Sequence, residues 1–164
     1  MKLDSPDSVP GGEDASGFRF AVVASRYSGE ISARLAATTC AYLEERGADA
    51  VDLFWVPGAF ELPGAIQPIA ESGLFHAVVG LGCILKGETD HDIYLAHAVA
   101  QGCTRITLDT GVPVLFGVIT ARTVEQARAR AGFDEGGKGR EAAAAAIAMA
   151  RLHRELPDRL GPVR

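Results

Sequence analysis

Residues 77–81 form an unbroken apolar run, Ala-Val-Val-Gly-Leu, and this run limits the possible folds of the chain more than any other segment does. A strand with one solvated face alternates apolar and polar residues, so a continuous run is typical of a parallel strand that is covered on both faces. Three further strands are predicted at residues 18–25, 50–56 and 114–120. The chain is therefore expected to build a parallel sheet with helices on both of its faces.

Apolar residues at helical spacing follow each predicted strand. The predicted helices are 30–46, 62–72, 91–110, 123–131 and 140–156. Strands that alternate with helices in this way are joined by right-handed crossovers, which gives a flavodoxin-like α/β fold. The sequence thus predicts a three-layer α/β/α sandwich with a four-stranded parallel sheet.

The length of 164 residues suits one domain, which we expect over residues 18–156. Residues 1–17 and 157–164 are expected to be tails, the first of them polar and flexible. The net charge of -5 argues against nucleic-acid partners. No apolar run approaches the roughly 18 residues of a membrane span, and the polar start lacks a secretory core, so a cytoplasmic location without membrane contact is expected. Three widely spaced cysteines predict free thiols.

The segment after the apolar run is the strongest candidate for a binding site. Gly82 and Gly87 are expected to form a loop, and Thr89 or Asp90 to cap a helix whose first turn carries His91. Backbone N–H groups and the helix dipole favour an anion such as phosphate at this place. An imidazole has an ordinary pKa of about 6.5, so His91 is a candidate proton shuttle, and a simple capping histidine is the alternative.

Other motifs in this region give weaker signals. The Gly-Leu-Gly at 80–82 is not a dinucleotide fingerprint, because Leu85 takes the place of the third glycine. Glu88 stands where a phosphate-binding loop of nucleotide hydrolases has lysine. His91 and His97 fall on different faces of a helix, so a metal site is not indicated.

Several side chains are open to two interpretations. Tyr27 and Phe60, at predicted loop tips, either cover the core or stack on a heterocycle. Cys83, at a buried strand end, is expected to be a packing thiol and not a nucleophile. Arg130 and Lys138, which flank the last glycine-rich loop, are either solvated surface charges or part of a site.

Several sequence blocks, in order, resemble those of the lumazine synthase family. The blocks are VPGAFELP at 56–63, KGETDH at 86–91, VLFGVIT at 114–120, residues 125–127 with 130–132, and residues 138–139. The resemblance covers residues 18–155. It implies a transferase of riboflavin biosynthesis that condenses 5-amino-6-ribitylamino-pyrimidinedione with 3,4-dihydroxy-2-butanone 4-phosphate. The products are 6,7-dimethyl-8-ribityllumazine, phosphate and water, and the family uses neither metal nor cofactor.

The resemblance also implies roles for particular residues. His91 would shuttle protons, Tyr27 would stack on the pyrimidine, and backbone N–H groups of Glu88 and Thr89 would bind the phosphate. Arg130 would pair with that phosphate. The substrate-binding residues that it implies are Tyr27, Ala59, Phe60, Glu61, Leu85, Glu88, Thr89, Phe116, Arg130 and Lys138.

The resemblance also implies a homo-oligomer, a pentamer or a sixty-subunit capsid of pentamers, in which a neighbouring subunit supplies Phe116, Arg130 and Lys138 to each site. The chain departs from the family at Tyr27-Ser28, where Phe or Trp followed by Asn is usual, and at Asp92-Ile93, where an aromatic residue and then an acid usually follow the histidine. These departures leave open a catalytically inactive member that binds a flavin or lumazine, or a shell protein selected for assembly.

Overall fold

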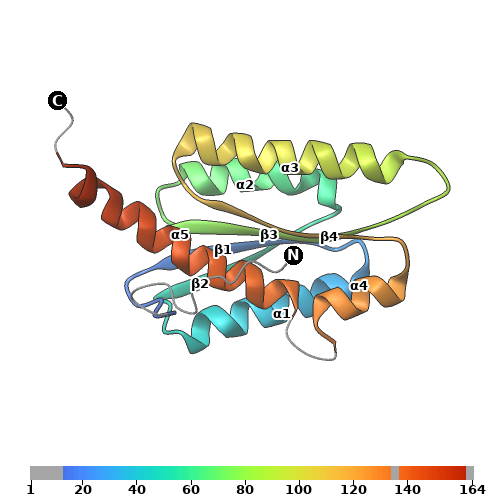
Figure 1. The fold of residues 1–164 in the computed structure, drawn as a ribbon, viewed down its shortest axis with the longest axis horizontal. Coiled ribbons are helices and arrows are strands. Elements are labelled where there is room, and N and C mark those ends of the chain that lie inside the picture. The colour runs from blue at the N-terminus through green and yellow to red at the C-terminus, as the bar shows by residue number, and fades with distance from the viewer. Residues whose placement is uncertain (1–12, 134–136, 162–164) are drawn as a thin grey trace, which may run out of the picture.

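Four parallel strands form the central sheet of the computed structural model, which describes residues 13–133 and 137–161 (Figure 1). The order across the sheet is β2-β1-β3-β4, so β2 and β4 are the edge strands. The strands are β1 (Arg19–Ser25), β2 (Ala50–Val56), β3 (Ala77–Leu85) and β4 (Val114–Ala121). The flavodoxin-like fold predicted from the sequence is confirmed.

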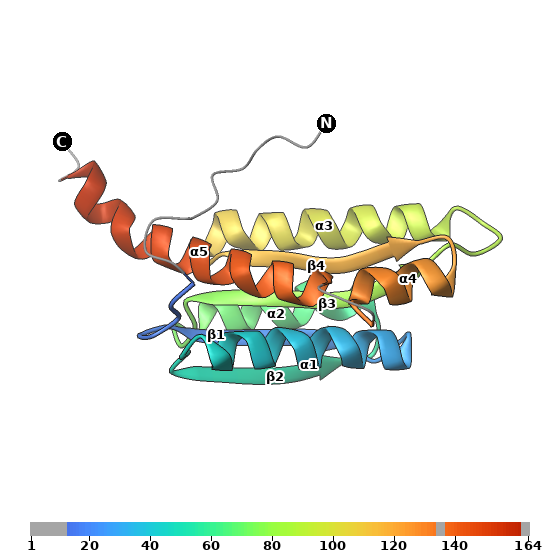
Figure 2. The same cartoon turned by 60° about the horizontal axis from the view of Figure 1, so that its bottom comes forward.

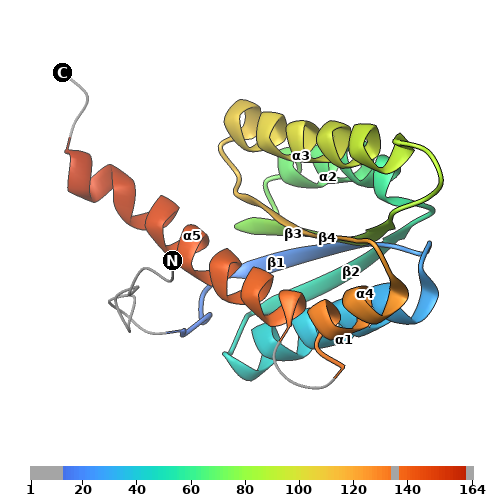
Figure 3. The same ribbon diagram turned by 45° about the vertical axis from the view of Figure 1, so that its right-hand side comes forward.

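Helices cover both faces of the sheet, as Figures 1 and 3 show. One face carries the short 3₁₀ helix η1 (Ala59–Glu61), α2 (Leu62–Glu71) and α3 (His91–Thr110). The other face carries α1 (Gly29–Glu45), α4 (Val124–Ala131) and α5 (Lys138–Leu160). Each face has its own apolar core, and the fully buried β3 residues alternate between the two, with Val79 and Leu81 on one side and Val78 on the other.

Strand β3 is longer than the sequence predicted. The sequence predicts a glycine loop that begins at Gly82, but β3 continues to Leu85 because β4 pairs with it from Val78, opposite Val114, to Leu85, opposite Ala121. Gly82 is needed for close packing within the sheet and not for a turn, since a Cβ there would lie 2.9 Å from Ser25 Oγ. The loop at the strand end is therefore short and begins at Lys86.

Helix α5 is also longer than the expected range of 140–156. It begins at Lys138 and extends through Pro157 to Leu160, past the body of the sheet (Figure 2). Its first turn lies against α1, where Thr39 Oγ1 donates a hydrogen bond to the Gly139 carbonyl at 3.1 Å. A Cβ on Gly139 would lie 2.9 Å from the Leu35 carbonyl oxygen. This close contact fixes the start of α5 and with it the backbone of Lys138.

Residues 13–17, which belong to the expected N-terminal tail, contact the domain. Ala15 is fully buried, and its N–H donates to the Arg46 carbonyl at 2.8 Å. The Gly17 N–H donates to Asp49 Oδ1 at 2.9 Å. Residues 1–12 of that tail, and 162–164 of the expected C-terminal tail, lie outside the described part of the chain. Within the described part, no helix has the length and apolar character that crossing a membrane requires.

Candidate active site

A cavity of about 670 Å³ opens at the carboxyl ends of β1, β2 and β3. We name it the histidine pocket. Its walls come from the loop after β1, from η1, from the end of β3, and from the loop and first turns that begin α3. The lining residues are Tyr27, Gly58, Ala59, Phe60, Glu61, Cys83, Ile84, Leu85, Gly87, Thr89, His91, Asp92 and Leu95. Segments far apart in sequence meet here because parallel strands all end at one edge of the sheet.

The loop after β1 presents the Tyr27 ring at the rim of the histidine pocket. The ring is 78% exposed, so it does not cover the core. Ser28 connects the loop to β3, since its hydroxyl donates to the Cys83 carbonyl at 3.2 Å. Its backbone φ of 74° is unusual for a residue other than glycine. Ser32 also holds the loop, because its hydroxyl donates to the Tyr27 carbonyl at 3.0 Å.

The turn at η1 is fixed by its own acidic residue. Glu61 Oε2 accepts the Gly58 N–H at 2.8 Å, so the carboxylate stabilises the turn that carries Ala59 and Phe60. Phe60 is 64% exposed and lines the pocket together with Tyr27, which places two exposed aromatic residues around one cavity. Such rings offer surfaces on which a flat heterocycle can stack.

His91 occupies the first turn of α3, as predicted, and its side chain lines the pocket. The expected side-chain cap is missing: Asp90 is the N-cap residue, but its carboxylate binds Lys86 and makes no cap hydrogen bond. Thr89 Oγ1 accepts the His91 N–H at a long 3.4 Å. Among residues 13–133 and 137–161, no side chain forms a hydrogen bond with the His91 imidazole.

Cys83 lies in the wall of the histidine pocket but is only 3% exposed. Burial raises the pKa of its thiol above the ordinary value, and the nearby Ser28 hydroxyl offsets this only in part. A thiol with a raised pKa stays protonated at neutral pH and is a poor nucleophile. The geometry therefore favours the packing role.

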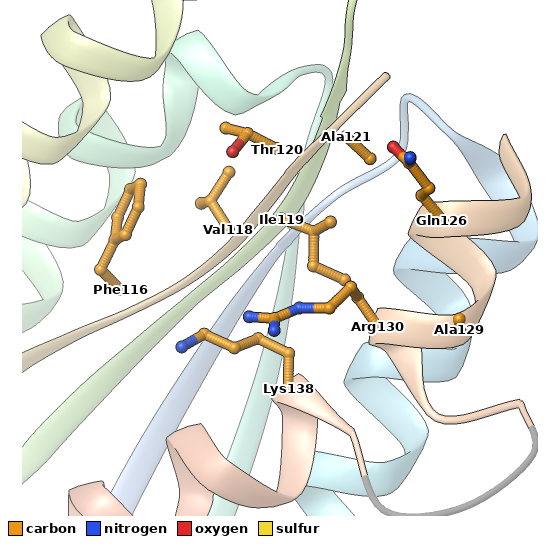
Figure 4. A pocket seen from close by; sticks show the side chains of 9 residues that line it. All are labelled: Phe116, Val118, Ile119, Thr120, Ala121, Gln126, Ala129, Arg130 and Lys138. Atoms are coloured by element: carbon orange, nitrogen blue, oxygen red, sulfur yellow. The ribbon is translucent and has the colours of Figure 1, made fainter. Parts of the chain in front are cut away.

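A second cavity, of about 620 Å³, lies beside edge strand β4 (Figure 4). We name it the arginine pocket. It is lined by Phe116, Val118, Ile119, Thr120, Ala121, Gln126, Ala129, Arg130 and Lys138. The side chains of Arg130, from α4, and Lys138, from the start of α5, extend in the same direction next to β4 (Figure 4). Lys138 lies 3.6 Å from Glu141, whereas Arg130 has no ion pair within the described residues.

The structure divides the predicted site residues between these two cavities, which share no lining residue. Phe116, Arg130 and Lys138 line the arginine pocket, Glu88 lines neither, and all the others line the histidine pocket. The pockets also differ in charge. Two carboxylates and no lysine or arginine line the first, whereas two cations and no carboxylate line the second.

Some lining residues were missed by sequence reasoning. Leu95 follows His91 at a spacing of four residues, which brings two side chains to one helix face and is a usable signal. Thr120 and Gln126 flank the turn from β4 to α4. Gln126 lies in the sequence block at 125–127 but was given no role in a site, and its N–H donates to the Thr123 hydroxyl at 3.2 Å. No local pattern marks Thr120 as part of a pocket.

The sheet and the two cavities define a doubly wound α/β protein with a candidate ligand site outside the carboxyl ends of its parallel strands. The chain belongs to the 6,7-dimethyl-8-ribityllumazine synthase family, whose family model matches residues 17–154. This is a family of transferases in riboflavin biosynthesis. The resemblance inferred from the sequence blocks is confirmed.

Proposed function

We propose that the chain is an active 6,7-dimethyl-8-ribityllumazine synthase. It would join 5-amino-6-ribitylamino-pyrimidinedione to 3,4-dihydroxy-2-butanone 4-phosphate and release phosphate and water. The observation that carries this proposal is the division of the family's motif residues into two pockets of opposite charge. Each pocket holds part of the groups that the reaction needs, and neither holds all of them.

In the histidine pocket, Tyr27 and Phe60 would hold the pyrimidine ring, and the η1 turn would contact the ribityl chain. His91 would move protons between the amine, the carbonyl and the leaving groups, as a general acid and base does. The enzyme's main contribution would be to hold the two substrates in reacting geometry, which is worth several orders of magnitude in rate. Backbone N–H groups around Thr89 would bind phosphate oxygens at the start of α3.

The charge of the histidine pocket indicates that this pocket alone would not bind the phosphate group of the substrate. Residues 86–92 contain one lysine and three carboxylates, a net charge of -2 with neutral His91, and this charge opposes a phosphate. Arg130 and Lys138 carry the positive charge that the phosphate needs, but they line the other pocket. We infer that the arginine pocket of one subunit faces the histidine pocket of the next. A ring that repeats this contact, a pentamer, would complete every site.

Exposed apolar residues support an assembly of this kind. Leu53, Phe54 and Trp55 on edge strand β2 are each 37–40% exposed, and Phe116 on the opposite edge strand is 36% exposed. Exposed apolar patches on sheet edges are commonly covered by another chain. In the proposed ring, Phe116 would be covered together with the substrate.

A turnover assay with both substrates tests the proposed function. Formation of the lumazine with one phosphate released per product would support it. Tight binding of the pyrimidine substrate or of the lumazine product, without phosphate release, would contradict it and indicate a carrier protein instead. A protein that forms large assemblies but neither binds nor converts the substrates would indicate a shell protein.

Replacing Tyr27 by alanine should raise the KM for the ribitylamino substrate about tenfold, because stacking on an exposed ring contributes about 1 kcal/mol or more. The KM for butanone phosphate should change less than about twofold, and Tyr27→Phe should be mild because it keeps the ring. Steady-state kinetics with each substrate varied in turn checks this. Equal rises in both KM values would show that the ring only supports the loop after β1.

A further inference from the structure

Lys86 is the first residue after β3, and its ammonium group contacts three oxygen atoms of the segment that follows. Lys86 Nζ lies 2.9 Å from Asp90 Oδ1, 3.2 Å from Asp92 Oδ1 and 3.3 Å from the Thr89 carbonyl oxygen. Its backbone N–H donates to the Ala121 carbonyl at 2.8 Å, so the base of the side chain is anchored to β4. Hydrogen bonds with Asp90 and then Asp92 raise the pKa of the amine, which stays protonated.

These contacts connect the two ends of the short loop of residues 87–90, which joins the end of β3 to the first turn of α3. Packing does little to hold this segment, since residues 87–91 are all exposed and a Cβ added at Gly87 would meet no atom within 4 Å. Where packing is absent, a loop keeps one conformation only through specific bonds. In the described part of the chain, Lys86 makes the side-chain bonds that join the two ends of this loop.

We infer that Lys86 is a positioning residue for the phosphate-binding loop, an inference that rests on the proposed function. It holds the loop in the conformation in which Gly87 and Thr89 line the histidine pocket and the backbone N–H groups are available to the phosphate. It also holds Asp92, so that the carboxylate next to His91 in sequence is bound to the amine. Lys86 acts through these residues and does not itself touch the phosphate.

Two observations separate this role from that of a phosphate ligand. Lys86 is not among the residues that line the histidine pocket. In addition, its single positive charge is already shared by two carboxylates, so the three side chains together carry a net charge of -1. A group with that charge does not attract phosphate, whereas a fixed loop with aligned N–H groups does.

The kinetic test compares Lys86→Met with Lys86→Arg. Lys86→Met should raise the KM for butanone phosphate about tenfold, because only a fraction of the loop would then be in the binding conformation. The KM for the ribitylamino substrate should change less than about twofold. Lys86→Arg should keep the KM for butanone phosphate close to the wild-type value, since a guanidinium can donate to the same three oxygens. The matched control is Arg105→Met, which removes an exposed ion pair between Arg105 and Asp109, both on α3.

A triple variant separates positioning from charge. Lys86→Met alone leaves two unpaired carboxylates, whereas Lys86→Met with Asp90→Asn and Asp92→Asn removes all three charges and is less negative than the wild type. If Lys86 acted only by compensating charge, the triple variant would bind the phosphate substrate at least as well as the wild type, and the proposal would be overturned. A KM as high as that of Lys86→Met supports positioning.

Amide hydrogen exchange gives a readout that does not depend on turnover. In the assembled protein, Lys86→Met should speed exchange in the peptide that covers residues 86–93, while Lys86→Arg and Arg105→Met should match the wild type. If the wild type proves inactive as a synthase, affinity for inorganic phosphate replaces the kinetic test, and Lys86→Met should bind it about tenfold more weakly. Unchanged exchange, or equal phosphate affinity in the two proteins, would overturn the inference.

Discussion

Replacing Arg130 by alanine should lower kcat/KM for butanone phosphate by about a thousandfold or more, the largest effect that we expect from a single substitution. A guanidinium binds two phosphate oxygens at once, and charge stabilisation of this kind is commonly worth about 10²–10⁵ in rate. The histidine pocket cannot supply this positive charge itself, because no lysine or arginine lines it. Steady-state kinetics on purified, assembled protein measures the loss.

Two further variants show whether the loss belongs to the site. Arg130→Lys keeps the charge but not the two-pronged geometry, so it should recover only part of the activity. Arg128→Ala is a control on the same helix: Arg128 pairs with Glu30 of α1, lies over the Phe133 ring and does not line the arginine pocket. It should stay within about threefold of wild type. Similar losses in Arg128→Ala and Arg130→Ala would indicate damage to α4 instead of a missing phosphate contact.

Replacing His91 by alanine should lower kcat by about a hundredfold or more, the usual contribution of a general acid and base. The fold should survive, because the His91 side chain is exposed and forms no hydrogen bond within the described residues. Some rate should remain, since the two substrates are still held together. The measurement is turnover at saturating concentrations of both substrates, with thermal unfolding as the check on folding.

His97 offers a matched control for the His91 variant. It lies on the same helix, is exposed and lines neither pocket. His97→Ala should therefore keep wild-type turnover. Near-wild-type turnover in His91→Ala would contradict the proton-shuttle assignment, and equal losses in the two variants would point to a general effect on α3.

The sheet and its covering helices could be predicted because the signals are local. Apolar runs such as 77–81 identify buried strands, and helical spacing identifies the helices between them. The true end of β3 could not be found in this way. Residues 82–85 lie between the loop-forming signals of Gly82 and Gly87 and look like a loop, but β4 pairs with them, and that pairing joins residues more than thirty positions apart. The order of the strands across the sheet is likewise a long-range property.

The candidate site was predictable in its residue types but not in its spatial division. The blocks around 56–63 and 86–91 lie at strand ends that meet at one edge, so their convergence follows from the fold. Asp90 illustrates a local signal that failed. Its position predicts a helix cap, but the ammonium group of Lys86 is close enough to bind the carboxylate and offers a full charge. In the single chain, Arg130 and His91 line different pockets because of which faces of β4 and α4 the other elements leave uncovered. The spacing of apolar residues in the sequence does not reveal those faces.

Mixed rings test the shared active site most directly. Equal amounts of His91→Ala and Arg130→Ala chains, each nearly inactive alone, are unfolded together and reassembled, and mass spectrometry establishes that single rings contain both chains. In a heterologous ring, an intact site forms wherever an Arg130→Ala chain supplies His91 and its neighbour, a His91→Ala chain, supplies Arg130, which random mixing makes about one interface in four. Recovery of roughly a quarter of wild-type activity is the predicted result. Rings that contain both chains but remain as inactive as either parent would contradict a site shared between subunits.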